Sequence, residues 1–267
     1  MRALRLIPVL LLLVLTSAFC RVEAEPLEFI FEHYSSDDGL PHNSICDIHQ
    51  DRRGYLWLCT WYGLSRYDGR NFVNYTMRPG DRSNLSHNRI LSIDEDASGY
   101  LWVTTYDRHL YRFDVEEEVF MSVSELLKDY QVSNSKVDNL FCDSSGNVWV
   151  ALSGAGLVRI CEDLSFDTYL NGSSGAIGDD ITGIYEDSEG KIYVVSEVGL
   201  TMISGNVPTL LARNVDVVAF VQRDRRLLFA CRDQLLCVEM DTREQIKVDF
   251  KGLGVGDAVT MTLTGPD

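Results

Sequence analysis

The 267-residue sequence lacks the motifs that identify several classes of enzyme. It has no His-x-x-x-His pair, no Gly-x-Ser-x-Gly element and no glycine-rich phosphate loop, which disfavours metallohydrolases, serine hydrolases and nucleotide-binding enzymes. Its seven cysteines follow neither a Cys-x-x-Cys metal site nor the spacing of a compact disulfide scaffold. We therefore expect no catalytic residue, no metal and no cofactor in this chain.

Basic residues are also scarce. The sequence has 24 Lys and Arg residues against 40 Asp and Glu residues, so the formal net charge is −16. A surface with this charge repels polyanions at long range, which argues against nucleic acid and sulfated glycans as general partners. A solvated acidic surface explains the same charge without any partner.

Long apolar runs are absent except at the N-terminus. Two arginines precede the apolar stretch Leu6–Leu15, and small residues follow up to Ala24. The stretch is too short to span a bilayer core of ~30 Å and is typical of a signal peptide. We expect residues 1–24 to be that signal peptide, with cleavage after Ala18 as the alternative, and residues 25–267 to be exported. No later run reaches eighteen apolar residues, so no later membrane span is predicted.

What the sequence does contain is a repeat. Four segments share an apolar pair, an Asp-x-x-Gly turn, a short aromatic and apolar run, a loop and a second apolar run. They begin at Ser44, Arg89, Lys136 and Asp180, and a degraded fifth copy without the turn glycine begins at Asp216. The repeated structural positions are Asp51, Gly54 and Trp57; Asp96, Gly99 and Trp102; Asp143, Gly146 and Trp149; and Asp187, Gly190 and Tyr193.

The period of the repeat predicts the fold. The anchor aromatics from Trp57 to Phe229 are 45, 47, 44 and 36 residues apart. A period near 45 with four short strands per unit is typical of β-propeller blades. We expect an all-β fold, an incomplete propeller of about five four-stranded blades plus the start of a sixth.

Each copy can be divided into strands. In the first, Ile45 and Ile48 belong to an innermost strand, Asp51 can accept backbone N–H bonds in the turn, and Gly54 supplies a positive φ. The other strands of this copy are expected at Tyr55–Cys59, Leu64–Tyr67 and Asn71–Tyr75. Outside the five copies, we expect an N-terminal strand at Leu27–Phe31, one short helix within Val123–Tyr130 and the first strand of a sixth blade at Asp257–Thr264.

The turn geometry also places two cysteines. If Asp51–Gly54 closes a hairpin with Gln50 opposite Tyr55, Cys46 and Cys59 are direct cross-strand neighbours. Such pairs are ~4.5–5.5 Å apart, within reach of a disulfide, and export permits the bond. Two small buried residues on adjacent strands are an equal alternative.

The strand order assigns the loops to two faces. The connection into the first strand and the loop between the second and third strands share one face, opposite the Asp-x-x-Gly turns. Candidate ligand-binding residues there are His42, Asn43, Trp61, Tyr62, His87, Asn88, Tyr106, Asp107 and Arg108, and later copies add Lys136, Ser153, Asp179, Asp180 and Glu197. Aromatic rings beside amide, carboxylate and guanidinium groups suit a sugar. Ordinary loops whose polar residues cap strand ends are the alternative.

The opposite face carries local basic spots at Arg52–Arg53 and Arg223–Arg226. They could dock an acidic neighbouring domain, or they could be solvated turn residues.

The repeat resembles the two-component regulator propeller repeat of periplasmic sensor regions in hybrid two-component histidine kinases. Residues 39–69 and 85–114 carry its Asp-x-x-Gly, aromatic-Leu-Trp-apolar and third-strand Arg elements. The fourth copy departs from the pattern, because Tyr193 replaces the tryptophan and Met202 replaces the arginine.

The resemblance implies a longer protein anchored in the inner membrane, with further propeller, immunoglobulin-like and kinase regions downstream. In Bacteroides-type bacteria such sensors detect oligosaccharides. The chain itself carries no kinase, receiver or DNA-binding element and is not expected to be an enzyme. Expected partners are an oligosaccharide, the downstream regions and a second copy in a homodimer. A secreted scaffold for another protein and a propeller glycosidase or lyase are the competing functions.

Overall fold

The computed structural model describes residues 31–77, 85–129, 136–170 and 175–249. Within these ranges, twenty strands form five antiparallel sheets of four strands each. Consecutive strands pair in every sheet, so each sheet is a simple meander. The expected all-β fold of four-stranded blades is confirmed.

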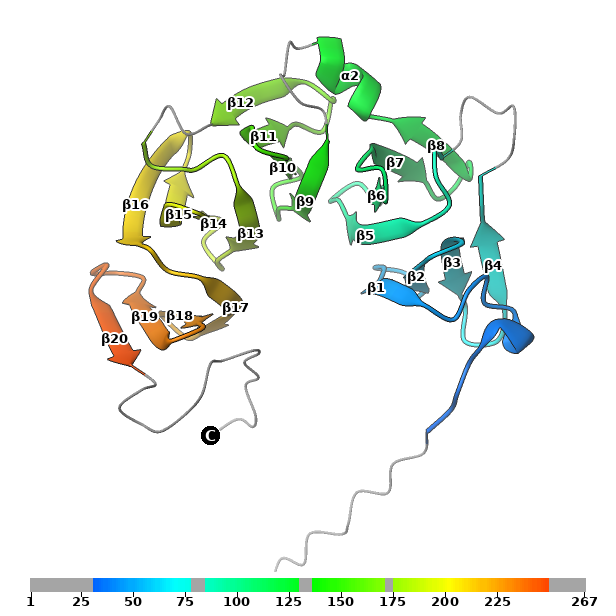
Figure 1. Cartoon of the computed structure of the whole chain (residues 1–267), viewed down its shortest axis with the longest axis horizontal. Helices are drawn as coiled ribbons and strands as arrows, with labels where there is room; N and C mark the ends of the chain where they lie inside the picture. Colours follow the sequence, from blue (N-terminus) through cyan, green and yellow to red (C-terminus); the bar gives the residue numbers. More distant parts are fainter. Residues whose placement is uncertain (1–30, 78–84, 130–135, 171–174, 250–267) are drawn as a thin grey trace, which may run out of the picture. The chain divides into compact units, whose positions relative to one another are not determined.

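The strands follow the repeat copies in order. Blade 1 is β1 (Ile45–Gln50), β2 (Leu56–Thr60), β3 (Gly63–Tyr67) and β4 (Phe72–Tyr75); blade 2 is β5 (Ile90–Glu95), β6 (Leu101–Thr105), β7 (Leu110–Asp114) and β8 (Val119–Ser122). Blade 3 is β9 (Val137–Cys142), β10 (Val148–Leu152), β11 (Gly156–Ile160) and β12 (Phe166–Leu170); blade 4 is β13 (Ile181–Glu186), β14 (Ile192–Ser196), β15 (Gly199–Ser204) and β16 (Val207–Arg213). Blade 5 is β17 (Val217–Arg223), β18 (Arg226–Cys231), β19 (Gln234–Glu239) and β20 (Gln245–Asp249). The first strands of neighbouring blades, from β1 to β13, contact one another (Figure 1).

The Asp-x-x-Gly turns are built from hydrogen bonds to the aspartate. In blade 1, the Asp51 N–H donates to the carbonyl of Tyr55 at 3.0 Å, and Oδ1 of Asp51 accepts from the N–H groups of Arg53 and Tyr55. Gly54 has a φ of 91°, a left-handed conformation that favours glycine. The predicted role of the turn aspartate is confirmed.

The same aspartate also binds the anchor aromatic, a contact that the repeat pattern did not predict. Its Oδ2 atom accepts a hydrogen bond from the ring donor six residues along the chain. The bonds are Trp57 Nε1 to Asp51 at 2.8 Å, Trp102 Nε1 to Asp96 at 2.7 Å, Trp149 Nε1 to Asp143 at 2.8 Å and Tyr193 OH to Asp187 at 2.9 Å. Each turn is therefore tied to the core of its own blade.

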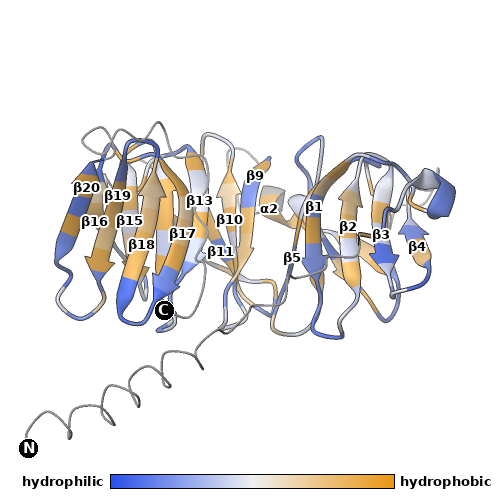
Figure 2. Ribbon diagram, turned by 90° about the horizontal axis from the view of Figure 1, so that it is seen from below, coloured by the Kyte–Doolittle hydropathy of each residue, from blue (hydrophilic) through white to orange (hydrophobic). Residues whose placement is uncertain are grey.

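The apolar core lies between blades. Four clusters of buried residues each combine two successive sheets, so that Trp57 packs with blade 2, Trp102 with blade 3 and Trp149 with blade 4. Figure 2 shows mainly apolar colouring on β18 and mixed colouring on the outer strand β20, whose five residues are all exposed. Packing between blades supplies the burial that one thin sheet lacks.

The first strand of blade 1 differs from its equivalents. Ile45 and Ile48 are 36% and 58% exposed, whereas Ile90 and Ile93 at the same repeat positions are 0% and 7% exposed. In the part of the chain that the structure describes, blade 1 packs through its β2 and β3 side chains onto blade 2. The two isoleucines of β1 belong to none of the clusters found there.

The predicted pairing of Cys46 and Cys59 is wrong. Gln50 lies opposite Leu56 and Asp47 lies opposite Cys59, because Asp51 pairs with Tyr55 and the connection between the strands is one residue longer than predicted. Beyond Asp47, a bulge at Cys46 shifts the register once more, so that Ile45 lies opposite Thr60. The register shifts at the same point of the first strand in all five blades. Both thiols are free, with Cys46 exposed and Cys59 buried.

The short predicted helix is confirmed as α2 (Ser124–Asp129), and one 3-10 turn, η2 (Ser36–Asp38), precedes blade 1. The expected second strand begins one residue late, at Leu56, because both backbone groups of Tyr55 bond to the turn aspartate. The predicted signal peptide, the sixth-blade strand and all of the predicted strand at 27–31 except Phe31 lie outside the described residues.

Candidate functional site

One main-chain hydrogen bond recurs on the face predicted to bind ligand. In each blade, the first residue after the second strand donates its N–H to the carbonyl of the residue before the first strand. The pairs are Trp61 to Ser44, Tyr106 to Arg89, Ser153 to Lys136, Glu197 to Asp180 and Arg232 to Asp216, at 2.8–3.3 Å. The two loops of each blade are thus joined, as the strand order predicted. We call this the loop face.

On the loop face, side chains of blades 1 and 2 form a continuous stack. The guanidinium of Arg89 lies 4.3 Å from the ring centroid of Trp61 and 4.5 Å from that of Tyr106. His42 stacks on Trp61 and His87 packs against Tyr106, each with ring centroids 5.5 Å apart. Trp61 and Tyr106 are 47% and 55% exposed. We call these five residues the aromatic–arginine stack.

The two histidines of the stack are fixed by their own backbone. Nδ1 of His42 accepts from the N–H of Ser44, and Nδ1 of His87 accepts from the N–H of Arg89, both at 2.9 Å. Because Nδ1 is an acceptor in both rings, Nε2 is the nitrogen left to donate to a ligand.

The side chains of the two predicted asparagines form hydrogen bonds to the backbone of nearby loops. Asn43 Oδ1 accepts from the N–H of Ser36 at 2.7 Å, and Asn88 Oδ1 accepts from the N–H of Met77 at 2.6 Å. Tyr62 lies beside Trp61 and is 55% exposed. The structure therefore leaves the Tyr62 ring accessible and engages the amide oxygens of both asparagines.

Asp107 is the centre of a polar cluster in blade 2. Its carboxylate accepts from Thr105 Oγ1 at 2.5 Å and Ser86 Oγ at 2.8 Å, and lies 2.9 Å from Nδ1 of His109. Partial burial raises the pKa of Asp107, but hydrogen bonds from Thr105, Ser86 and His109 outweigh it and lower the pKa. In a nucleophilic triad the histidine lies between serine and carboxylate. Here the carboxylate is central, so this cluster does not activate Ser86.

Arg108 joins blade 2 to blade 3. Its Nη1 atom lies 2.7 Å from Asp138 Oδ1 and donates to Ser153 Oγ at 2.9 Å, while its carbonyl accepts from the N–H of Val137. Two of the predicted site residues, Arg108 and Ser153, are thus brought together and bonded to each other.

The loop face becomes acidic in blades 4 and 5. Glu197 accepts from the N–H groups of Asp179 and Asp180 at 2.9 and 3.0 Å. A hollow of about 440 Å³ lies beside it, lined by Asp180, Thr182, Val195, Ser196, Glu197, Asn214, Val215 and Asp216. Across the described ranges, no three His, Cys, Asp or Glu side chains converge as metal ligands do.

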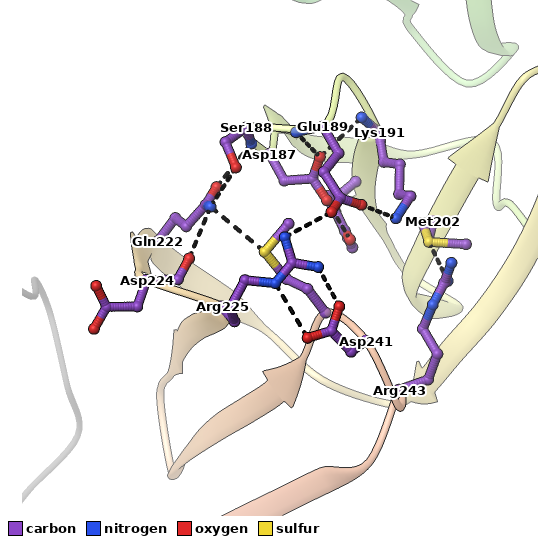
Figure 3. Close-up of polar contacts among 12 residues, drawn as sticks. Asp187, Ser188, Glu189, Lys191, Met202, Gln222, Asp224, Arg225, Asp241 and Arg243 are labelled. Atoms are coloured by element: carbon purple, nitrogen blue, oxygen red, sulfur yellow. Dashed lines mark hydrogen bonds and ion pairs between the residues drawn. The ribbon is translucent and has the colours of Figure 1, made fainter.

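The basic spots of the opposite face are paired within the chain. Arg52 bonds to Glu95 and to the carbonyls of Asp96 and Ala97 in blade 2. Figure 3 shows Arg225 between Glu189 of blade 4, at 2.8 Å, and Asp241 of blade 5. Arg52 and Arg225 thus form ion pairs between neighbouring blades. Neither the predicted docking of an acidic domain nor the alternative of solvated turn residues included these contacts.

Three comparisons relate the chain to known proteins. A model of the family described as SMP-30/Gluconolactonase/LRE-like region matches residues 11–163. Histidine kinase P4 of Formosa agariphila is 36% identical over 64 residues, which are 24% of this chain and 5% of the kinase. This similarity agrees with the expected resemblance to histidine kinase sensors.

Solved structures also align with the chain. The extracellular domain of a protein described as a hybrid two-component system, from B. thetaiotaomicron, aligns with a TM-score of 0.49 at 18% identity, over 78% of this chain and 35% of its own. PorZ, a surface component of the type-IX secretion system of Porphyromonas gingivalis, aligns with a TM-score of 0.54 at 15% identity. The alignment covers 78% of this chain and 33% of the PorZ chain. The chain thus spans about a third of these proteins. None of its described helices is long and apolar enough to cross a membrane.

Proposed function

This chain belongs to the SMP-30/Gluconolactonase/LRE-like family, and we propose that it is the extracytoplasmic ligand-sensing propeller of a two-component signalling protein. The proposed ligand is an oligosaccharide bound on the loop face. Residues 1–24 act as the signal peptide, residues 25–267 form propeller repeats in the periplasm, and a kinase region in a longer protein receives the signal.

The aromatic–arginine stack is the observation that carries this proposal. Trp61 and Tyr106 expose large ring surfaces, although main-chain bonds hold their loops in place. Sugar CH faces pack on such rings, and sugar hydroxyls need donors and acceptors nearby. Nε2 of His42 and His87 supplies donors beside the rings, since Nδ1 of each ring is engaged by the backbone. The kinase similarity supports signalling as the purpose of binding.

Calorimetry tests the proposal. The purified chain is titrated with a panel of neutral and acidic oligosaccharides, and binding is compared with that of the Trp61→Ala and Tyr106→Ala variants. Ile246→Ala is the control, because Ile246 is equally exposed but lies in β20. We expect at least one oligosaccharide to bind, and both stack variants to weaken it about tenfold or more while the control does not.

Two results contradict the proposal. If no member of the panel produces heat of binding, the alternative of a protein-binding scaffold gains support. If an oligosaccharide binds equally well to both stack variants, the ligand site lies elsewhere in the chain.

A further inference from the structure

The backbone of Arg89 is held in place on the loop face by two hydrogen bonds. It immediately precedes β5, and its N–H donates to Nδ1 of His87. Its carbonyl accepts from the N–H of Tyr106 at 2.9 Å. Both backbone groups are therefore engaged, which positions the side chain toward the rings.

The guanidinium bridges two blades. Trp61 belongs to blade 1 and Tyr106 to blade 2, and Arg89 lies against both rings. Its contact with Trp61 is the shortest but one among the arginine–ring contacts of the described residues, and Trp61 and Tyr106 are exposed. Stacking engages the flat faces of a guanidinium and leaves its N–H edge available for other bonds.

The guanidinium makes no hydrogen bond within the described ranges. Among the described residues, no hydrogen bond or ion pair reaches it, and Nε is buried without a partner. The terminal nitrogens are not among the buried unpartnered atoms, so they remain accessible. Six other arginines on the surface are paired with carboxylates, namely Arg52, Arg53, Arg108, Arg225, Arg226 and Arg232.

Arg89 differs from the other ring-stacked arginines of the described residues because its Nε is buried without a partner and the rings it contacts are exposed, so its guanidinium is placed to bind an anionic group of a ligand. We propose that Arg89 recognises a sugar carboxylate, so that the oligosaccharide contains a uronic acid; this inference rests on the proposed function above. A carboxylate accepts paired hydrogen bonds from the guanidinium edge, and neighbouring sugar rings pack on Trp61 and Tyr106. Because the acidic surface repels densely charged polymers, a short oligosaccharide with an isolated carboxylate fits best.

The test uses three matched ligands and the full chain. They are an oligosaccharide with one uronic acid, the same molecule with that carboxyl reduced to an alcohol, and the same molecule with a sulfate ester there. Affinities are measured by calorimetry for the unmodified protein, Arg89→Gln and Arg89→Lys. Arg53→Gln is the control, because Arg53 lies on the opposite face and pairs with Glu116.

We expect the unmodified protein and the control to bind the uronate about tenfold or more tightly than its reduced form. Arg89→Gln should bind both at the affinity of the reduced form, and Arg89→Lys should keep part of the preference. In the unmodified protein, the ¹⁵N resonance of the Arg89 side chain should shift with the uronate only, which keeps the test valid if a variant fails to fold.

The outcomes separate this inference from the proposed function. Equal binding of the uronate and its reduced form overturns the inference that Arg89 recognises a carboxylate, and so does an unchanged preference in Arg89→Gln. Either result leaves the proposal of oligosaccharide sensing intact. Tighter binding of the sulfate ester overturns the carboxylate in favour of sulfate. If none of the three ligands and no member of the wider panel binds, both proposals are overturned.

Discussion

Trp57 and Trp61 lie four residues apart on either side of the end of β2, yet Trp57 is fully buried and Trp61 is 47% exposed. Trp57 donates its indole N–H to Asp51 and packs between blades, whereas Trp61 stacks with His42 and Arg89 on the loop face. One repeat thus holds a tryptophan for stability next to a tryptophan available to a ligand.

The two tryptophans should respond oppositely to truncation. Trp57→Ala removes a buried ring and should lower the free energy of unfolding by about 3–5 kcal/mol. Trp61→Ala should change it by less than about 1 kcal/mol while weakening oligosaccharide binding. Urea unfolding measures the change in the free energy of unfolding, and titration calorimetry on the same protein preparations measures the change in binding affinity. A large loss of stability in Trp61→Ala would contradict its assignment to the ligand.

The turn aspartates should contribute more to stability than ordinary turn residues. Asp96→Ala leaves the amides of Ser98 and Tyr100 and the indole of Trp102 without their acceptor, so we expect a loss of roughly 2–4 kcal/mol. Asp114 accepts two turn amides but no indole, and Asp114→Ala should lose about 1 kcal/mol. Equal losses by urea unfolding would show that the indole bond adds nothing.

Equivalent isoleucines in blades 1 and 2 should differ in the same assay. Ile93→Ala creates a cavity between blades and should lower the free energy of unfolding by about 2–5 kcal/mol. Ile48→Ala, at the exposed position of β1, should lower it by about 0.5 kcal/mol or less. A loss in Ile48→Ala as large as that in Ile93→Ala would mean that the β1 face is covered in solution.

The stability contributed by Asp107 should depend on pH in a defined direction. Its folded-state pKa is lowered below the ordinary value of 3.8, so its ionised form stabilises the fold above that pH. The difference in unfolding free energy between the unmodified protein and Asp107→Asn should stay constant from pH 5.5 to about 4.5. It should then shrink as the pH falls through the lowered pKa. A difference that grows on acidification would contradict the direction of the shift.

The cysteines should differ in reactivity. Burial raises the pKa of the Cys59 thiol well above its usual range, whereas Cys46 is exposed. Iodoacetamide at pH 8 should label Cys46 in the native protein and Cys59 only after unfolding, as read by peptide mass spectrometry. Cys46→Ser is the control for the labelled peptide. Recovery of a crosslinked Cys46–Cys59 peptide without reductant would contradict the structure.

The features that the sequence predicted well are local. The Asp-x-x-Gly turn, the short strands and the period all depend on residues close in the chain, and the sheets follow them. The bulge at Cys46 escaped prediction because an apolar pair three residues apart is compatible with a strand both with and without an extra residue. The two cysteines were misaligned for a different reason, because Asp51 pairs with Tyr55 and makes the connection one residue longer than the predicted four-residue turn.

The parts of the site that the sequence missed depend on contacts between blades. The loop positions of Trp61 and Tyr106 were predictable from strand order, but Arg89 lies between rings of two different blades. Nothing in the spacing of one copy indicates that contact. The partners of Arg52 and Arg225 were missed for the same reason, since Glu95 and Glu189 belong to neighbouring blades.

The main-chain bond that joins the two loops of each blade uses no side-chain atom. The donor position can therefore carry any residue except proline, which has no N–H, and in this chain it carries tryptophan, tyrosine, serine, glutamate and arginine in blades 1 to 5. If the loop face binds ligand as we propose, exchanging these side chains would change what it recognises, while the strands beneath stay the same. An engineer can do likewise, one blade at a time.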